Sequence, residues 1–219
     1  MLSNGQRNSL GKTQVNDLTV FTIGHSTHSY EHFLSLLRAA GITAVADVRT
    51  TPFSRHFPQF NEVTLRTELT LDGISYVFLG RELGGRPSGR GFYCDGVADY
   101  EKMAKSETFA SGINRVIEGA KKFRVALMCS EHDPLDCHRC LLVGRALSRE
   151  GVKLVHILGD SSSVSHEAIE EKLLNLAGRS GDDLLMTAPE RLSAAYRDRS
   201  LKVAYVEPPS DLKAHSAKR

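Results

Sequence analysis

The chain has 219 residues, of which 41% are hydrophobic and 25% charged, proportions that provide for a real core in an ordinary globular protein. Its formal net charge of +2 excludes nucleic-acid binding through bulk electrostatics, so any basic site must be local. The first residues lack the apolar region of a signal peptide, and no apolar run approaches the roughly 18 residues of a membrane span, so we expect a cytoplasmic protein with no membrane partner.

Strand and helix patterns alternate along the chain. Short apolar runs predict five strands, at residues 19–23, 43–48, 75–79, 124–128 and 153–158. Helical spacing of apolar residues predicts helices at 29–40, 61–71, within 99–122, at 136–150, at 165–177 and at 189–199, while 80–96 reads as a long Gly/Arg-rich loop. This order predicts an α/β fold: a mostly parallel, open sheet of about five strands with helices on both faces.

Three segments differ in pattern. Residues 1–17 are expected to be a flexible N-terminal extension, and residues 18–178 the α/β domain. Residues 179–219 are expected to be a C-terminal helical extension that ends in a loose tail. This extension either mediates a homodimer or packs back on the core.

Polar and titratable residues collect in the loops that follow the predicted strands. Ligands of open α/β sheets bind outside the carboxyl ends of the strands. The side chains at that edge include His25, Asp47, Arg49, Ser54, Arg55, Arg81, Glu82, Arg86, Cys129, Glu131, Cys137, His138 and Arg139. The loops at the opposite edge are short and lack such a collection of polar and titratable residues. The sequence therefore predicts an active site at the C-terminal strand ends.

Arginines at this edge indicate an anionic ligand, because guanidinium groups bind phosphate or carboxylate through paired donors. Arg49, Arg55 and Arg139 are the candidates, helped by backbone N–H groups at the predicted helix start near Cys137. The alternative is that these arginines pair with carboxylates such as Asp47 as structural clamps.

Residues 127–140 hold three of the four cysteines and two histidines. One reading is a zinc or iron site formed by Cys129, Cys137 and Cys140 with His132 or His138. A second is thiol redox chemistry through the Cys137-x-x-Cys140 spacing at a helix start. A third is catalysis by single thiols, with Glu131 as general acid or base.

Short motifs with a distinctive composition are spread over residues 20–174. They are Thr22-Ile-Gly-His-Ser26, Asp47-Val-Arg49, Ser54-Arg55, Pro58-x-Phe60, Leu83-Gly84-Gly85, Met128-Cys-x-Glu131 and Cys137-His-Arg139. Together they resemble the family called domain of unknown function 488 (DUF488). The resemblance implies one shared pocket, to which it adds Tyr76 and, after the last strand, His166. The family pattern is Cys-His-Arg, so the resemblance implies that Cys140 is a bystander.

Residues 46–53 also resemble the Asp-x-Arg segment of rhodanese-like sulfurtransferases. In those enzymes a short anion loop joins a catalytic cysteine to an arginine at a helix start. The stretch between Cys129 and Arg139 is longer than such a loop.

The leading hypothesis is an enzyme, a hydrolase or transferase, that acts on a phosphate-bearing substrate such as a nucleotide or nucleic-acid component. The catalytic candidates are Cys129, Glu131, Cys137, Asp47 and His25. The substrate-binding candidates are Arg49, Ser54, Arg55, Tyr76, His138 and Arg139. The alternatives are a protein that binds zinc or iron through Cys129, Cys137 and His138, a rhodanese-like sulfurtransferase, and a non-catalytic nucleic-acid-binding module.

Overall fold

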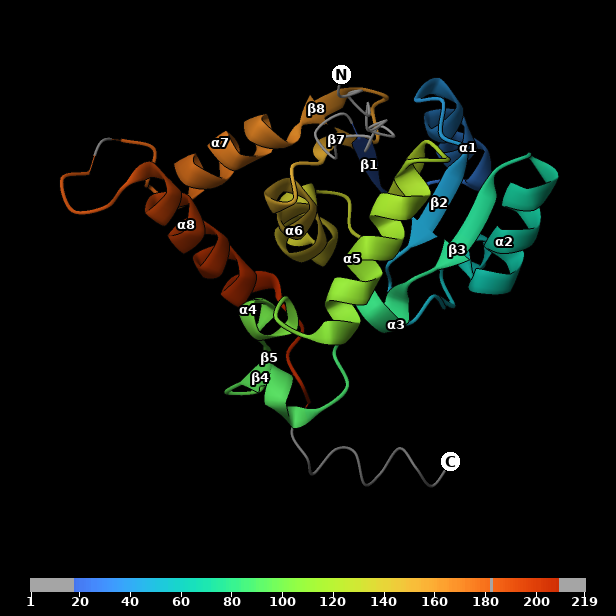
Figure 1. Cartoon of the computed structure of the whole chain (residues 1–219). Coiled ribbons are helices and arrows are strands. Elements are labelled where there is room, and N and C mark those ends of the chain that lie inside the picture. Colours follow the sequence, from blue (N-terminus) through green and yellow to red (C-terminus); the bar gives the residue numbers. More distant parts are fainter. Residues whose placement is uncertain (1–17, 182, 209–219) are drawn as a thin grey trace, which may run out of the picture.

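A six-stranded sheet forms the centre of the protein (Figure 1). The computed structural model describes residues 18–181 and 183–208, so the predictions for residues 1–17 and 209–219 lie outside the described residues. The strands are β1 (Thr19–Gly24), β2 (Ala44–Asp47), β3 (Ser75–Phe78), β6 (Val125–Cys129), β7 (Lys153–Ile157) and β8 (Ser163–Ser165), in the spatial order β3-β2-β6-β1-β7-β8. The first five run parallel and β8 is antiparallel to β7, which confirms the predicted mostly parallel sheet.

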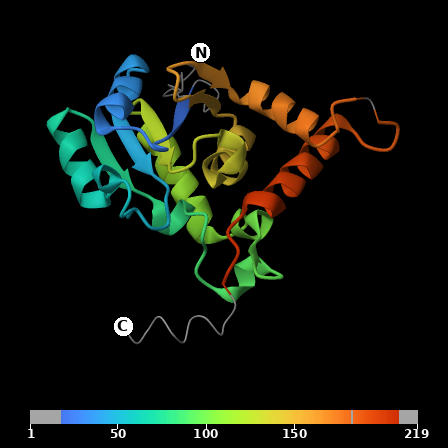
Figure 2. The same ribbon diagram turned by 180° about the vertical axis from the view of Figure 1, so that it is seen from behind.

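Helices cover both faces of the sheet, as predicted (Figures 1 and 2). Helices α1 (Tyr30–Ala39) and α2 (Glu62–Leu71) pack on one face, where Met128 of β6 meets Phe33 and Leu65 in one buried cluster. On the other face, Leu127 is buried in the cluster that contains residues of α5 (Glu107–Ala120). Successive strand residues point to opposite faces, so a strand covered on both sides is apolar throughout and reads as an uninterrupted hydrophobic run.

The connections leaving β1 and β6 diverge. The chain passes from β1 into α1 on one face of the sheet, and from β6 into the helical segment that precedes β7 on the other face. These two strands are neighbours. Adjacent parallel strands whose connections leave to opposite faces open a crevice at their carboxyl ends, which is where α/β proteins bind ligands.

Residues 80–96 contain more structure than the predicted loop. They form α3 (Gly80–Leu83), the 3-10 turn η3 (Arg90–Phe92) and β4 (Tyr93–Cys94), which pairs antiparallel with β5 (Val97–Ala98). Between β4 and β5, Asp95 and Gly96 both have positive φ, at 50° and 79°. Asp-Gly is a strong signal for such a two-residue hairpin turn, so the prediction of a plain loop was wrong here.

The predicted helix at 136–150 begins later and is not uniform. A 3-10 turn, η4 (Pro134–Asp136), comes first, and Cys137 is extended with φ −137°. A π-helix, η5 (Arg139–Gly144), then leads into α6 (Arg145–Arg149). Short π-helical stretches are rare and occur often at functional sites.

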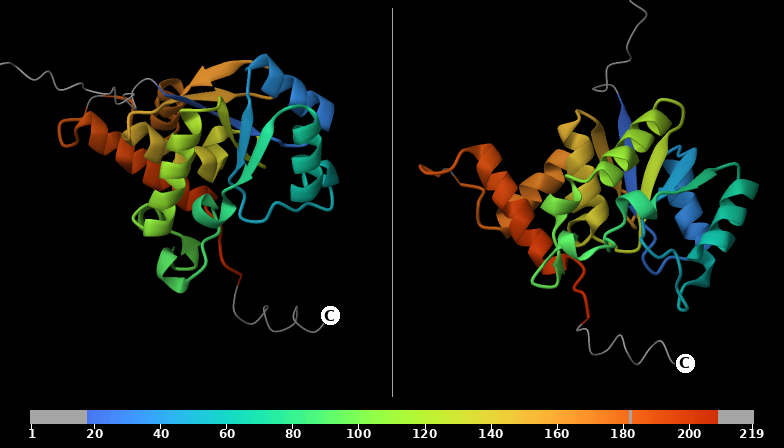
Figure 3. Two further views of the ribbon diagram at one scale, coloured as in Figure 1. Left: turned by 45° about the vertical axis from the view of Figure 1, so that its right-hand side comes forward. Right: turned by 60° about the horizontal axis from the view of Figure 1, so that its bottom comes forward.

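The C-terminal extension packs back on the core. Helix α8 (Ala188–Val203) lies against α7 (His166–Leu176) (Figure 3). Its Tyr196 is only 1% exposed. Beyond it, the Tyr205 carbonyl accepts a 2.9 Å hydrogen bond from Ala98 N–H, and Val206 bridges to Val97. The extension therefore reaches α4 (Tyr100–Met103) and the β4–β5 hairpin, beside the carboxyl edge of the sheet. Within the described ranges no helix is both long and apolar enough to cross a bilayer.

Candidate functional site

Two adjoining pockets open at the carboxyl ends of β1, β2 and β6. The reactive pocket, of about 260 Å³, is lined by Arg49, Thr50, Thr51, Gly85, Arg86, Tyr100, Cys129, Ser130, Glu131, Asp136, Cys137, His138, Val203 and Tyr205. The hydroxyl pocket, of about 410 Å³, is lined by His25, Ser26, Thr27, Arg49, Thr51, Phe53, Ser54, Phe57, Arg86 and Ser130. Four shared residues join them into one site at the predicted edge of the sheet.

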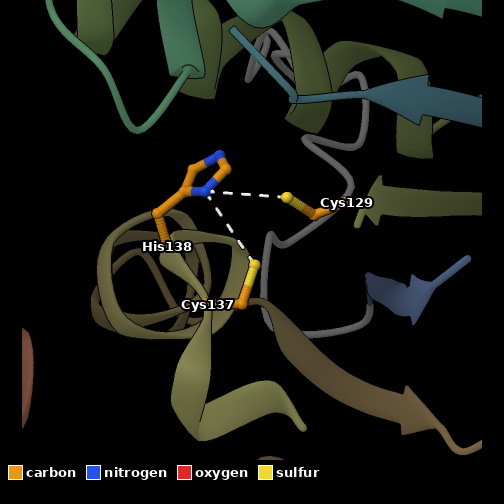
Figure 4. Close-up of side chains that lie close together, drawn as sticks. All are labelled: Cys129, Cys137 and His138. Atoms are coloured by element: carbon orange, nitrogen blue, oxygen red, sulfur yellow. Dashed lines mark hydrogen bonds between the residues drawn. The ribbon is translucent and has the colours of Figure 1, made fainter. Parts of the chain in front are cut away.

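Two thiols and one imidazole meet in the reactive pocket (Figure 4). The Nδ1 atom of His138 lies 3.7 Å from the Cys129 sulfur and 3.9 Å from the Cys137 sulfur. Cys129 ends β6, whereas Cys137 and His138 immediately precede η5, so the folded chain brings the end of a strand against the start of a helix. All three side chains are almost completely buried.

The hydrogen bonding of His138 fixes which ring nitrogen faces the thiols. Its Nε2 atom lies 2.8 Å from the backbone carbonyl oxygen of Val48. A carbonyl oxygen only accepts, so Nε2 must carry a proton. In the neutral ring the lone pair is then on Nδ1, directed at both sulfurs. It can take a proton from a thiol or bind a metal ion.

Glu131 completes the cluster. Its Oε2 atom lies 3.0 Å from both sulfurs, although part of the residue is exposed to solvent. Burial of the carboxylate and the negative charge of Cys137 raise its pKa. A protonated Glu131 would donate to the sulfur of Cys137 rather than repel it.

The two thiols differ in their tendency to ionise. Burial by itself raises the pKa of Cys137, but the hydrogen bond from the Cys129 thiol and the charges of Arg139 and His138 outweigh it, so the pKa lies well below the ordinary thiol value. The backbone N–H of Arg139 adds a 3.4 Å contact to the Cys137 sulfur. Burial and the neighbouring Cys137 and Glu131 raise the pKa of Cys129 well above that value. The site therefore favours one thiolate, on Cys137.

Arg139 lies behind the thiols and lines neither pocket. It is completely buried, and its guanidinium donates to the carbonyl oxygens of Glu131 at 2.6 Å and His132 at 3.0 Å. These bonds hold the loop that carries Glu131 and place a positive charge near Cys137. The prediction that Arg139 binds the substrate is not tested, and the location of its side chain outside both pockets does not favour it.

A clamp of hydrogen-bonded side chains lies at the end of β2. It consists of the buried residues Asp47, Arg49 and His25 and the half-buried Tyr76. The Asp47 carboxylate accepts from Arg49 Nη2 at 2.5 Å and from the Tyr76 hydroxyl at 2.8 Å. Arg49 Nη1 lies 3.2 Å from His25 Nε2, and Nη2 also donates to the Phe60 carbonyl at 2.8 Å. At most one guanidinium N–H remains for a ligand.

His25 is held neutral in this clamp. Its ring stacks on Phe60, with the ring centroids 4.3 Å apart, and its Nδ1 lies 3.0 Å from the Ser26 carbonyl oxygen. Burial and the charge of Arg49 lower the pKa of His25 to about 4. The catalytic roles predicted for His25 and Asp47 stay predictions, and the geometry shows them positioning Arg49.

The hydroxyl pocket is suited to an anion. It is lined by the hydroxyl-bearing residues Ser26, Thr27, Thr51, Ser54 and Ser130, and among the described residues no carboxylate lines it. Arg49 and Arg86 supply positive charge. Ser54, a predicted ligand residue, is in the lining, whereas Arg55 is exposed and lines neither pocket.

Several pocket residues were not among the catalytic and substrate-binding candidates, and Arg86, Tyr100 and Tyr205 are the largest polar ones. Arg86 belongs to the loop after β3, and its guanidinium lies 4.8 Å from the ring centroid of Tyr205. Tyr205 comes from the C-terminal extension and Tyr100 from α4. For Arg86 the signal was its place at the carboxyl edge. For the two tyrosines no local pattern distinguishes a pocket residue from a packed aromatic.

Gly85 passes too close to His138 for any side chain. A Cβ atom at residue 85 would lie 2.8 Å from Cγ and 2.9 Å from Nδ1 of the His138 ring. We expect Gly85→Ala to lower the free energy of unfolding by roughly 1–3 kcal/mol and to displace Nδ1 from the sulfurs. Urea denaturation measures the loss. Gly91→Ala is the matched control, because no heavy atom lies within 4 Å of its added Cβ, and an equal loss in both variants would contradict the close contact.

Two groups of described residues have the composition of a metal site. In the first, the ligand atoms of Cys129, Cys137 and His138 all lie within 4.8 Å of one another. In the second, those of Cys140, His156 and His166 do. The predicted alternative with Cys140 and His132 as ligands beside the pocket thiols does not correspond to either group.

Comparison with known proteins gives one match. The model of the family described as domain of unknown function DUF488 matches residues 29–146. This range includes the clamp residues Asp47, Arg49 and Tyr76, and also Arg86, Cys129, Glu131, Cys137 and His138. No curated protein matches the chain. No solved structure matches it either.

Proposed function

Because the chain belongs to the DUF488 family, a family of unknown function, we propose its activity from the pocket itself: an enzyme that uses the Cys137 thiolate as a nucleophile on a substrate carrying an anionic group. The observation that carries this proposal is the orientation of His138. Its Nε2–H is committed to Val48, so its Nδ1 lone pair faces the sulfurs of Cys129 and Cys137 inside a pocket.

The arrangement resembles the general form of an activated nucleophile, in which a base lies beside the thiol and a third group orients the base. Here the Val48 carbonyl orients His138, and His138 takes the proton of Cys137. The nearby guanidinium of Arg139 supports the resulting anion. Cys129 keeps its single proton and donates it to the Cys137 thiolate.

The hydroxyl pocket supports an anionic substrate. A phosphate or carboxylate there would meet hydroxyl groups and the positive charge of Arg86 and Arg49, with no lining carboxylate to repel it. The neighbouring reactive pocket would then hold the bond to be broken beside Cys137.

The proposed chemistry is a two-step group transfer. The Cys137 sulfur bonds to the electrophilic centre, and the bond to the leaving atom breaks. That atom departs with the electron pair and takes the proton from His138 Nδ1. A water or other acceptor then attacks, giving its proton back to Nδ1, and the sulfur leaves as a thiolate. Water as acceptor makes the enzyme a hydrolase, and any other acceptor makes it a transferase.

Two alkylating reagents of different charge test the proposal. Iodoacetate is anionic and iodoacetamide is neutral, and both react with thiolates. We expect Cys137 to react with both at neutral pH, with a preference for iodoacetate about tenfold above that of exposed Cys94, which corresponds to roughly 1.4 kcal/mol of charge interaction. Mass spectrometry of the digested protein assigns each modified cysteine.

Arg86→Ala should remove most of this preference, whereas Arg90→Ala, in the same loop but outside both linings, should keep it. Slow alkylation of Cys137 that rises only with the ordinary thiol titration would refute the nucleophile. Fast alkylation with no charge preference would refute the anionic substrate and leave the nucleophile in place.

A second candidate function is metal binding by the same three ligand atoms. The Nδ1 lone pair facing two sulfurs favours it, because zinc and iron bind thiolate and imidazole together. The ion would occupy the thiolates and exclude them as free nucleophiles. Elemental analysis of the purified Cys140→Ser variant separates the two: a stoichiometric ion lost on Cys129→Ser substitution supports the metal, and less than about 0.1 ion per chain removes it.

A further inference from the structure

A second cluster of metal-ligating side chains lies in the core, separate from the pocket. We propose that Cys140, His156 and His166 bind a transition-metal ion of the zinc class, and that this ion ties together η5, β7 and α7. The site is distinct from the three ligands of the reactive pocket and does not depend on the proposed function.

The three ligands come from three different elements and are deeply buried. Cys140 lies in η5, His156 in β7 and His166 at the start of α7, with exposed fractions of 0%, 0% and 2%. Their ligand atoms all lie within 4.8 Å of one another. The closest pair is His156 Nε2 and His166 Nδ1, 3.0 Å apart.

The hydrogen bonds around the two imidazoles fix their protons in the metal-free protein. The Tyr196 hydroxyl donates to Glu170 at 2.8 Å, so its oxygen accepts from His166 Nε2–H at 3.1 Å. The lone pair of neutral His166 is then on Nδ1, where it accepts from His156 Nε2–H. The remaining nitrogen of His156 accepts from the Thr22 hydroxyl at 2.7 Å.

Both imidazoles are neutral, which is the form that binds metals. Burial, together with the charge of Arg139, lowers the pKa of His156 to about 3. Burial lowers the pKa of His166 to about 4. Neutral imidazole and thiolate are the ligand types that zinc, cobalt and copper share.

Metal binding requires one tautomer change, and the surrounding groups permit it. The His156 proton moves from Nε2 to Nδ1, and the Thr22 hydroxyl turns from donor to acceptor. His166 keeps its proton on Nε2, against Tyr196. Each ligating ring then donates its outer N–H to a fixed oxygen, the usual support of metal-binding histidines. Cys140 gives up its thiol proton, so one proton is released for each ion bound.

The distance between the two imidazole nitrogens needs only a small adjustment. Zinc binds imidazole nitrogens at about 2.0–2.1 Å, which in tetrahedral geometry separates the two nitrogens by roughly 3.3 Å. The present 3.0 Å therefore has to increase by a few tenths of an ångström. Tyr196 belongs to α8, so the ion would also couple the C-terminal extension to the sheet through its hydrogen bond with His166.

The test uses Cys129→Ser/Cys137→Ser protein, which lacks the pocket thiols. The chain is unfolded and refolded with Co²⁺, so that the ion need not enter a closed core. We expect one retained cobalt per chain, a thiolate-to-cobalt absorption band, and release of one proton per ion. Adding Cys140→Ser should abolish the band, whereas adding Cys94→Ser, at an exposed thiol, should leave it unchanged.

Tyr196→Phe provides a variant that keeps all three ligands. It should weaken cobalt binding about 10- to 100-fold by removing the acceptor for His166, and it guards against misfolding of the Cys140→Ser protein. The proposal is overturned if the double variant retains no cobalt, if the band survives Cys140→Ser, or if Tyr196→Phe leaves the affinity unchanged. None of these outcomes bears on alkylation of Cys137, which tests the proposed function separately.

Discussion

The Arg139→Met variant should unfold with a free energy of unfolding roughly 3–5 kcal/mol below that of the parent protein. The Arg139 side chain is completely buried and donates to the carbonyl oxygens of Glu131 and His132. Methionine fills similar space but leaves both carbonyl oxygens without this donor, and each lost partner costs about 1–3 kcal/mol. Removing the cation also leaves the Cys137 thiolate without its guanidinium support.

Urea denaturation at neutral pH measures this loss. Arg115→Met is the matched control, since Arg115 pairs with Glu82 on the surface and an exposed pair contributes less than about 1 kcal/mol. A loss for Arg139→Met no larger than for Arg115→Met would show that the loop between β6 and η5 does not depend on the buried guanidinium.

The His138→Gln variant should reduce the rate of Cys137 alkylation at neutral pH by about 100-fold or more, the usual contribution of a positioned base. Glutamine can still donate to the Val48 carbonyl but cannot take a proton from sulfur. Without Nδ1 and its positive charge, burial dominates and the pKa of Cys137 rises. The measured quantity is the second-order rate constant with iodoacetamide.

His32→Gln is the control for this variant. The His32 ring also meets a backbone carbonyl, with Nε2 lying 2.9 Å from Gly159 O, but it contacts neither thiol. Its alkylation rate should equal that of the parent. Equal rates in His138→Gln and the parent would remove His138 from the activation of Cys137.

Local sequence signals predicted most of the parallel sheet and the edge that holds the site. The apolar run before Cys129 predicted β6 within one residue, because a strand buried on both faces must be apolar throughout. The helix predicted at residues 29–40 begins as α1 (Tyr30–Ala39), and the Ser29 hydroxyl caps it by accepting from the His32 backbone N–H at 3.2 Å. The strand order depends on long-range pairing, which leaves little trace in local periodicity, and the three-residue β8 is too short to show a period.

The structure brings together several side chains that the sequence had grouped, but the sequence could not show which of their atoms were already hydrogen-bonded. Cys129, Glu131, Cys137 and His138 meet as one cluster. Arginine often binds anions, yet most of the guanidinium N–H groups of Arg49 are already hydrogen-bonded within the clamp. Hydrogen-bond partners of this kind come from distant segments, so residue type and spacing do not reveal them.

The sequence also could not show which side chains lie beside Cys140. The family pattern made it a bystander, because the motif there ends at Cys-His-Arg. In the folded chain its sulfur lies beside two histidines from β7 and α7, residues that are far away in sequence. Only the packing of η5 against both elements brings the three together.

The proposed function depends on Cys137 being a thiolate at neutral pH, and ultraviolet absorbance of the thiolate measures this ionisation most directly. The measurement is a pH titration of metal-free parent, Cys129→Ser and Cys137→Ser proteins. We expect the thiolate band of the parent and of Cys129→Ser to persist to pH values well below the ordinary thiol range, and Cys137→Ser to lack it. A band that appears only within or above that range, or that survives in Cys137→Ser, would contradict a preformed thiolate at Cys137.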